Sequence, residues 1–126
     1  MSTGKLFEKL VYNRLLLREL SNNVTQAEAK VQKAKLKIKL SNPLMIEDLD
    51  TLLDSKNELE RAVAQKNLCE AEYKKLESEV LSLFEGIENK RVSFTVLKDA
   101  QNLKNPNYSI SVQKNHIELY GEGLQG

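Results

Sequence analysis

Apolar residues recur every seven positions along the chain, from its beginning to about Lys90. In the first half, one series starts at Leu10, and a second series, starting at Leu6, fills the positions between. The members of the two series are Leu10, Leu17, Val24, Val31 and Ile38, and Leu6, Asn13, Leu20, Ala27 and Ala34. A seven-residue repeat held over about five heptads is typical of the seam of a coiled coil. This half of the chain is therefore predicted to form one long helix.

The same repeat returns after a short break and predicts a second long helix. Its members are Met45, Leu52, Leu59, Lys66, Tyr73, Val80 and Ile87, with Ala62, Cys69, Leu76 and Leu83. Between the two halves lies Ser41-Asn42-Pro43. Proline cannot continue the first helix but suits the first position of the second, and serine or asparagine can cap its free amides. Residues 1–90 are thus expected to form a long antiparallel two-helix coiled-coil hairpin that turns near residues 41–43.

The distribution of charge supports this folding back. The segment from Lys30 to Lys39 holds five lysines and no acid, whereas the segment from Glu47 to Glu60 holds six acids and only Lys56 as a base. A turn near Asn42 places the two segments side by side, with each charge at the helix end that its macrodipole favours. Exposed pairs contribute only a few tenths of a kcal/mol each. Their expected effect is on the orientation and register of the helices.

Two polar residues, Asn13 and Lys66, interrupt the apolar seam. A polar residue at a seam position commonly fixes register at some cost in stability. The alternative is that the two residues belong to a buried polar site.

From Arg91 the spacing of apolar residues changes to two, which is typical of strands with one buried face. The three apolar runs are Val92, Phe94 and Val96; Tyr108, Ile110 and Val112; and Ile117 and Leu119. A two-residue turn at Lys114-Asn115 would pair Val112 with Ile117 and Ile110 with Leu119. We expect a three-stranded antiparallel β-meander over residues 91–121 and a flexible tail over residues 122–126. The predicted fold class is α+β, mostly α, with the chain forming a single structural unit.

The small sheet needs a cover, and the base of the hairpin, where the first helix begins and the second ends, can supply it. This base also carries more apolar residues than a two-helix seam requires, and the sheet has open edges. We therefore expect self-association, or a permanent protein partner, at the base. The residues expected at this interface are Phe7, Val11, Leu15, Leu16, Leu81, Phe84, Phe94, Tyr108 and Ile110.

The tip of the hairpin offers a second partner surface. Its apolar residues outside the main seam are Leu44, Ile46, Leu49 and Leu53. In this alternative the protein is an adaptor, or a holdase-like chaperone that grips its clients with the tip. Helical arms joined to small strands resemble prefoldin superficially, but here the strands follow both helices, and no family membership is inferred.

Composition narrows the class of protein. Charged residues make up 29% of the 126 residues and aromatic residues 6%, with no tryptophan, which fits a helical protein rich in surface better than an enzyme. The net charge of +1 gives no general attraction to nucleic acid or to anionic membranes. Cys69 is the only cysteine, and the N-terminal residues lack the pattern of a signal peptide. We expect a soluble, cytoplasmic protein with no membrane partner, and a virus particle is the alternative location.

The sequence shows no set of residues that would carry catalysis. His116 is the only histidine and is expected to be a solvated strand residue. It has no zinc-type spacing to Cys69, and the chain has no phosphate-binding glycine loop. The acidic cluster at Glu47 lacks the spacing of a calcium loop. We expect no enzymatic activity, no cofactor and no metal.

The lysine run remains as a candidate binding feature. Phosphate groups could be contacted by Lys30, Lys33, Lys35, Lys37 and Lys39. The neighbouring acidic helix and the lack of interleaved aromatic residues disfavour nucleic acid as a partner. The leading hypothesis is a non-enzymatic structural or assembly protein that oligomerises through its base and presents a helical arm, as in a viral or other multi-subunit particle. The alternatives are the tip-gripping adaptor and a nucleic-acid-binding arm.

Overall fold

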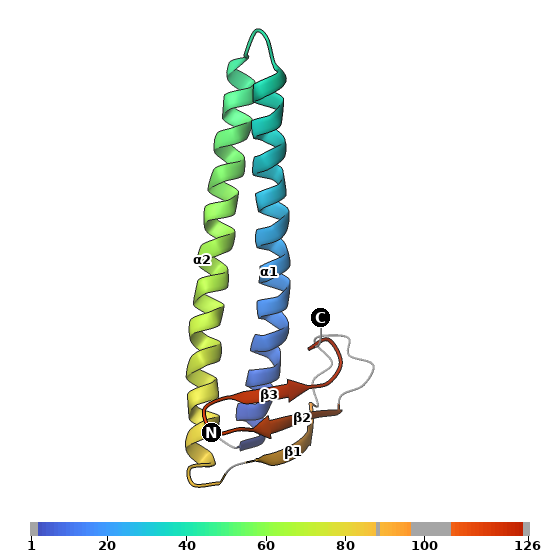
Figure 1. The fold of residues 1–126 in the computed structure, drawn as a ribbon, viewed down its shortest axis with the longest axis vertical. Helices are drawn as coiled ribbons and strands as arrows, with labels where there is room; N and C mark the ends of the chain where they lie inside the picture. Colours follow the sequence, from blue (N-terminus) through green and yellow to red (C-terminus); the bar gives the residue numbers. More distant parts are fainter. Residues whose placement is uncertain (1–2, 88, 97–106, 125–126) are drawn as a thin grey trace. The chain divides into compact units, whose positions relative to one another are not determined.

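A computed structural model describes residues 3–87, 89–96 and 107–124 of the chain. Two long helices, α1 (Thr3–Leu40) and α2 (Ile46–Leu83), precede three strands, β1 (Lys90–Thr95), β2 (Asn107–Val112) and β3 (Ile117–Tyr120) (Figure 1). The helices pack on each other and the strands form an antiparallel sheet. The predicted fold class, α+β and mostly α, is therefore confirmed.

The chain divides into two units. The arm unit comprises residues Leu17–Cys69, and the base unit comprises the residues up to Leu16 together with those from Glu70 onward. Each unit contains a part of both helices, and the base unit also contains the sheet. Whether the chain behaves as a single structural unit stays a prediction, as do the domain limits drawn from the sequence.

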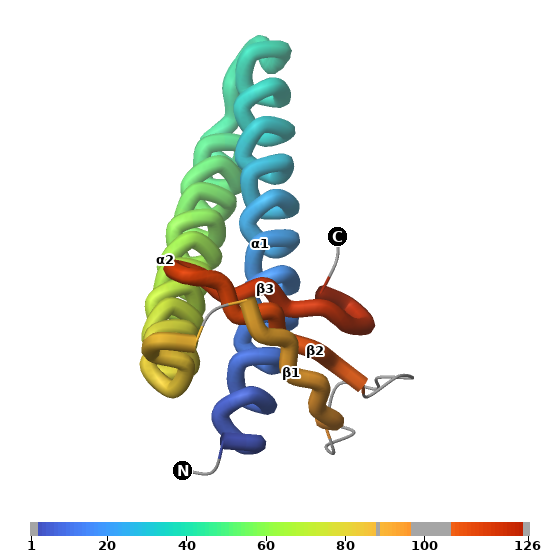
Figure 2. The backbone as a smooth tube through the Cα atoms, turned by 60° about the horizontal axis from the view of Figure 1, so that its bottom comes forward, coloured from blue at the N-terminus to red at the C-terminus, as the bar shows by residue number. Residues whose placement is uncertain are grey.

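In the arm unit the chain follows α1, turns, and returns along α2 (Figure 2). The turn lies where it was expected, but its details differ from the prediction. Pro43 is not the first helical residue, because α2 begins only at Ile46 and its first turn closes with the Asp48 amide donating to the Met45 carbonyl (3.1 Å). Ser41 does not cap α2 either. Its hydroxyl donates to the Lys37 carbonyl at 2.7 Å, which satisfies a carbonyl in the last turn of α1.

The fully buried positions of the arm's seam hold small and medium residues, whereas its larger residues are half-buried. The buried residues on α1 are Val24, Ala27, Val31 and Ala34. On α2, Ser55 and Cys69 are buried, and Leu52 and Leu59 are half-buried. Ser55 occupies a seam position that the apolar pattern skipped, and its hydroxyl donates to the Thr51 carbonyl at 2.8 Å. A buried hydroxyl is tolerated there because it has this partner.

Not all predicted seam residues are covered, and one of the two polar interruptions, Asn13, is hydrogen-bonded within its own helix. Met45 is 55% exposed, so the seam ends before the turn. Leu83 and Ile87, at the other end of the pattern, are also about half exposed. Asn13 is half-buried and donates to the Lys9 carbonyl of its own helix at 3.0 Å. Among the described residues, no buried side-chain nitrogen or oxygen lacks a hydrogen-bond partner.

The sheet has the order β1-β2-β3 and is antiparallel throughout. Val112 pairs with Ile117 and Ile110 pairs with Leu119, so the predicted register is confirmed. The Gln113 amide donates to the His116 carbonyl at 2.9 Å and closes the two-residue turn between them. Alternation places the apolar residues of β2 and β3 on one face of the sheet.

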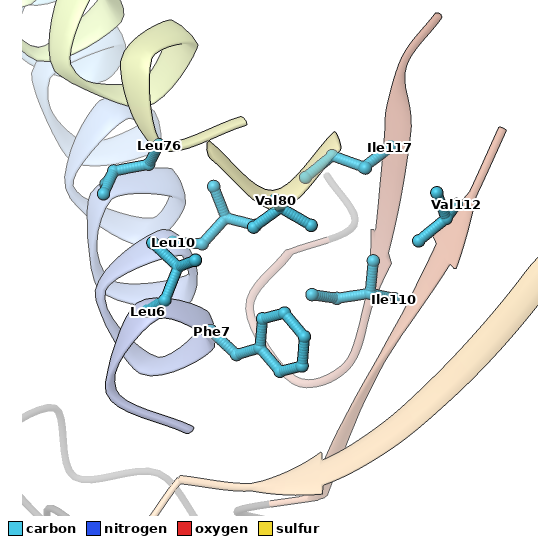
Figure 3. Packing of buried hydrophobic residues seen from close by; sticks show 8 residues of the cluster. All are labelled: Leu6, Phe7, Leu10, Leu76, Val80, Ile110, Val112 and Ile117. Atoms are coloured by element: carbon cyan, nitrogen blue, oxygen red, sulfur yellow. The ribbon is translucent and has the colours of Figure 1, made fainter. Parts of the chain in front are cut away.

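The core of the base unit lies between the helices and this apolar face, as expected. Side chains from α1, α2, β2 and β3 point toward a common centre (Figure 3). The cluster consists of Leu6, Phe7, Leu10, Leu76, Val80, Ile110, Val112 and Ile117. A second cluster joins Val11, Val96, Tyr108 and Leu124. Leu124 belongs to the segment expected as a tail, and residues 125–126 of that segment lie outside the described residues.

Candidate protein-binding surface

The apolar residues expected to form an interface at the base lie mostly in the core of the base unit. Phe7, Val11, Tyr108 and Ile110 are at most 4% exposed. Leu15, Leu81, Phe84 and Phe94 are partly buried and pack against the two core clusters. Only Leu16, at 44%, is clearly exposed. The interface at the base stays a prediction. The chain's own sheet already covers much of the apolar surface that was expected to bind a partner.

The tip residues have the opposite character. Ile46, Leu49 and Leu53 are 74%, 46% and 57% exposed, and Leu44, just before α2, is 44% exposed. Residues spaced by three and four positions lie on one face of a helix. Ile46, Leu49 and Leu53 therefore form a continuous exposed row on α2, which we call the apolar stripe. A contiguous exposed apolar surface of this kind marks an interaction site more often than a scattered leucine does.

Ion pairs identify one flank of the arm. Lys30 Nζ lies 3.0 Å from Glu58 Oε1, and Lys37 Nζ lies 3.2 Å from Asp48 Oδ1. Lys30 and Glu58 each directly precede a seam residue of their helix. A shallow hollow on the same flank is lined by Asn23, Gln26, Ala27, Lys30, Glu58, Arg61, Ala62 and Gln65. We call this side of the arm the paired flank.

The apolar stripe lies on the other flank. In each heptad, two seam residues lie three positions apart. Because a helix turns by about 100° per residue, the residue just before the first of them and the residue just after the second project on opposite sides of the seam. Leu49 directly follows the seam position Asp48, and Lys35 directly follows Ala34. Both residues therefore project on the flank opposite Lys30 and Glu58, which we call the open flank. Ile46 and Leu53 lie in the next row of residues around the surface of α2, further from the seam than Leu49.

Charges border the apolar stripe on both sides. On the α1 side lie Lys35 and, one turn later, Lys39, both exposed. On the far side, beyond Ile46 and Leu53 around α2, comes the exposed Asp50. Within the described part of the chain, Lys35, Lys39 and Asp50 have no ion pair. Lys37 faces Asp48, and the two helices run in opposite directions. Two residues before Lys37 and two residues after Asp48 therefore reach the same level of the arm, which places Lys35 and Asp50 level with each other.

The lysine run therefore does not form one basic surface. Lys30 and Lys37 are paired with acids of α2, whereas Lys35 and Lys39 lie on the open flank. Lys33 is exposed as well. Phosphate binding by the five lysines stays a prediction, with the positive charge divided between two sides of the arm.

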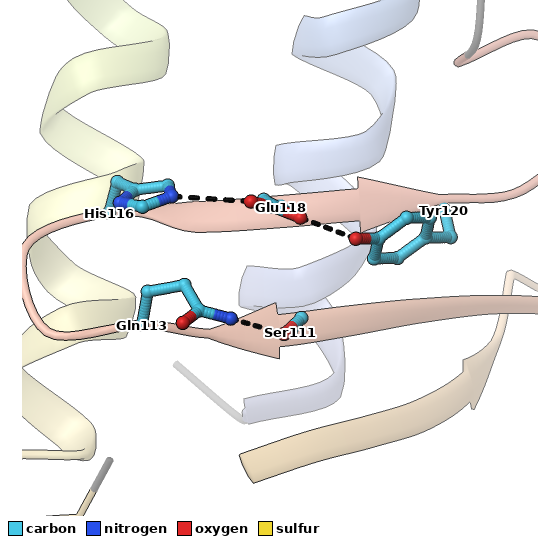
Figure 4. A network of polar contacts seen from close by, with 5 residues as sticks. All are labelled: Ser111, Gln113, His116, Glu118 and Tyr120. Carbon is cyan, nitrogen blue, oxygen red and sulfur yellow. Dashed lines mark hydrogen bonds and ion pairs between the residues drawn. The ribbon is translucent and has the colours of Figure 1, made fainter. Parts of the chain in front are cut away.

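The outer face of the sheet carries a row of polar contacts that the sequence analysis did not single out. Glu118 accepts a hydrogen bond from the Tyr120 hydroxyl and lies 3.3 Å from His116 Nε2 (Figure 4). The hydrogen bond from Tyr120, followed by that from His116, lowers the pKa of Glu118, and the bond to Glu118 raises the pKa of Tyr120. Residues at alternate positions of a strand share a face, so the spacing of these three was a usable signal.

This row is anchored to the neighbouring strands. The Arg91 guanidinium lies 4.7 Å from the centre of the Tyr120 ring and donates to the Ser109 hydroxyl at 3.1 and 3.2 Å. His116 is exposed, as predicted, but it directly precedes β3 instead of lying within the strand. The contacts order the outer side chains of all three strands, and no serine or cysteine hydroxyl or thiol is hydrogen-bonded to His116 among the described residues.

In the part of the chain that the structure describes, no three histidine, cysteine, aspartate or glutamate residues are grouped closely enough to hold a metal ion. No helix within the described ranges has an apolar stretch of the length needed to cross a membrane. Comparison of the chain with protein-family models, with curated proteins and with solved structures gave no match.

Proposed function

We propose that the protein is a non-enzymatic assembly protein that presents its helical arm to a protein partner through the apolar stripe. The observation that carries the proposal is the exposure of Ile46, Leu49 and Leu53 in one row on α2. Covering the exposed part of these side chains would contribute on the order of 1 kcal/mol each. A row of apolar residues spaced by three and four positions is the pattern by which a helix docks against another helix.

The base supports this choice of surface by contrast. Most of its apolar residues pack within the base unit, so they leave less exposed apolar surface for a partner than the sequence pattern suggested. The sheet edges at β1 and β3 have no neighbouring strand among the described residues and remain a second place for association. The stripe is the better candidate because its side chains gain burial only when a partner covers them.

The adaptor and holdase alternatives use the same end of the arm. A holdase needs a surface that adapts to many unfolded clients, and such surfaces are flexible or rich in methionine. The stripe instead consists of branched side chains on a helix, with charges at fixed positions on both borders. This arrangement favours a defined partner. Since Cys69 is the only cysteine, the chain fits a reducing compartment such as the cytoplasm, and a virus particle is the alternative setting.

Site-specific photo-crosslinking tests the proposal. A photoreactive amino acid is placed at Leu49 on the open flank and, as the matched control, at Gln26 on the paired flank, and the full chain is expressed in its own cells. We expect a discrete adduct from position 49 that is absent from position 26. Replacing Ile46 and Leu53 by serine should abolish this adduct while circular dichroism shows unchanged helix content. Equal labelling from both positions, or none from position 49, would overturn the proposal.

A further inference from the structure

The apolar stripe has a positively charged border on one side and a negatively charged border on the other. Across the open flank, the order is Lys35 on α1, Leu49 and then Ile46 and Leu53 on α2, and finally Asp50. The positive border and the negative border lie at the same level of the arm, as the Lys37–Asp48 pair shows. A surface with opposite charges on its two sides can complement a rotated copy of itself.

Two-fold symmetry decides which rotation gives this match. In a symmetric dimer the same patch faces itself, and the symmetry axis lies in the interface. If the axis runs along the arm, the two copies are parallel, and the positive border of one copy faces the negative border of the other at the same level. If the axis runs across the arm, the copies are antiparallel, and each border faces its own kind. Only the parallel arrangement brings Lys35 opposite Asp50.

We infer that the apolar stripe binds a second copy of this chain in a parallel two-fold dimer, with Lys35 of each copy facing Asp50 of the other. This inference rests on the proposed function and names the partner. The interface would contain two symmetric charge pairs around a centre of six apolar side chains, three from each copy. The arms of the two copies together form a four-helix bundle, the usual packing for helices with an apolar row beside the seam.

The lack of ion pairs at the border residues supports a second copy. On the paired flank, Lys30 and Lys37 are neutralised by acids within the same chain. Lys35 and Asp50 have no ion pair in the described part of the chain, and the exposed stripe lies between them. Rim charges mainly select partners and orientation, because like charges brought face to face oppose association. A foreign partner would have to supply an acidic and a basic residue at this same spacing.

The first test measures the mass of the full chain by light scattering coupled to size exclusion over a hundredfold range of concentration. We expect a mass approaching twice 14.4 kDa at the upper end. The variant with Ile46→Ser and Leu53→Ser should remain a monomer. Leu68→Ser is the matched control, since Leu68 is 73% exposed but lies away from the stripe, and it should dimerise like the unchanged chain.

The second test reverses the charges and identifies the arrangement. Lys35→Glu alone and Asp50→Lys alone should each weaken dimerisation roughly tenfold, because each places like charges opposite each other. An equimolar mixture of the two variants should form a mixed dimer about as tightly as the unchanged chain, since both pairs are then restored. Reversal of Lys33, by Lys33→Glu, is the control and should have little effect.

The outcomes separate this inference from the proposed function. A chain that stays monomeric at all concentrations, while position 49 still crosslinks to a different protein, overturns the second copy and leaves the proposed function standing. A dimer that is unaffected by the stripe substitutions, or charge variants whose mixture does not recover, also overturns it. Monomers together with no adduct from position 49 would overturn both.

Discussion

Lys37 Nζ lies 3.2 Å from Asp48 Oδ1, so the last turn of α1 is joined to the first turn of α2 by an ion pair. The two partners are in different surroundings: the Lys37 side chain is 69% exposed and the Asp48 side chain only 12%. Asp48 also lies at the N-terminal end of α2, where the helix dipole favours a negative charge. Lys37 likewise lies in the last turn of α1, where the helix dipole favours a positive charge, so the two partners differ in their burial and not in the number of their favourable interactions.

This difference gives a prediction for single substitutions. Asp48→Asn should lower the free energy of unfolding by about 1 kcal/mol, because it removes the ion pair and a charge at a helix end from the less exposed side chain, where water screens the charge less. Lys37→Met, which keeps the length of the side chain, should cost no more than about 0.5 kcal/mol. Urea denaturation at low salt measures both values. A larger loss for Lys37→Met than for Asp48→Asn would contradict this explanation.

A second prediction concerns the core of the base unit. Leu10 is fully buried among residues of α1, α2 and the sheet (Figure 3). Leu10→Ala should lower the free energy of unfolding by about 2–5 kcal/mol, because it removes apolar contacts and leaves a cavity. Leu36→Ala is the control, since Leu36 is 56% exposed, and it should change stability by less than about 0.5 kcal/mol. Thermal and chemical denaturation of both variants measure these changes. Comparable losses of stability in the two variants would mean that the core lies elsewhere.

The parts of the fold that could be predicted from the sequence are those that repeat. The seven-residue series predicted both helices, and the two-residue alternation predicted the pairing of Val112 with Ile117. Periodicity reports which face of an element is apolar, and for regular elements that is enough to set register. Ser55 was missed because the pattern counts apolar residues, and this serine is buried with its hydroxyl bonded to its own helix.

Periodicity does not say which surface covers an apolar face, and this limited the prediction of the site. Phe7 and Ile110 were assigned to an interface with a partner, yet both lie in the core of the base unit. Leu124 gave no periodic signal and is nevertheless buried beside Tyr108. The tip residues were named correctly as apolar positions outside the seam, but the charged borders depend on the level of α1 relative to α2. That level became known only from the pair between Lys37 and Asp48.

Tyr73 gives a prediction about pH. Burial, helped by the negative charge of Glu77 and opposed by Arg14, raises the pKa of Tyr73 from 10.0 to about 12. The folded state therefore holds its proton more tightly than the unfolded state between these values. Stability from this group is fully present below pH 10 and is lost as the pH rises toward 12, by at most about 1.4 kcal/mol per pH unit.

The effect of Tyr73 can be isolated by Tyr73→Phe, which cannot ionise. The difference in melting temperature between the two proteins should be constant up to about pH 9.5 and should then shift in favour of the phenylalanine variant. Absorbance at 295 nm should show one fewer late-titrating phenol in the variant. A parallel loss of stability in both proteins through pH 11 would show that another group is responsible.

Gly121 is predicted to be the glycine at which a side chain is least tolerated. Its φ is +150°, a value that residues with a side chain rarely adopt, and an added Cβ would overlap the ring of Tyr108. That ring cannot move away easily, because Tyr108 is 3% exposed and its hydroxyl donates to the Glu122 carbonyl at 3.0 Å. Gly121→Ala should therefore cost about 2–4 kcal/mol, from backbone strain together with displacement of the ring.

Two other glycines separate these causes. Gly86 also has a positive φ, of +81°, but open space around its Cα, so Gly86→Ala should cost about 1 kcal/mol from strain alone. Gly4 lies in α1 with open space and an ordinary backbone, so Gly4→Ala should be neutral or stabilising by up to about 0.5 kcal/mol. Chemical denaturation of the three variants should give the order Gly121, Gly86, Gly4 from most to least destabilised. If Gly121→Ala cost no more than Gly86→Ala, the close packing of the chain on Tyr108 would contribute nothing, and the turn after β3 would owe its conformation to the glycine backbone alone.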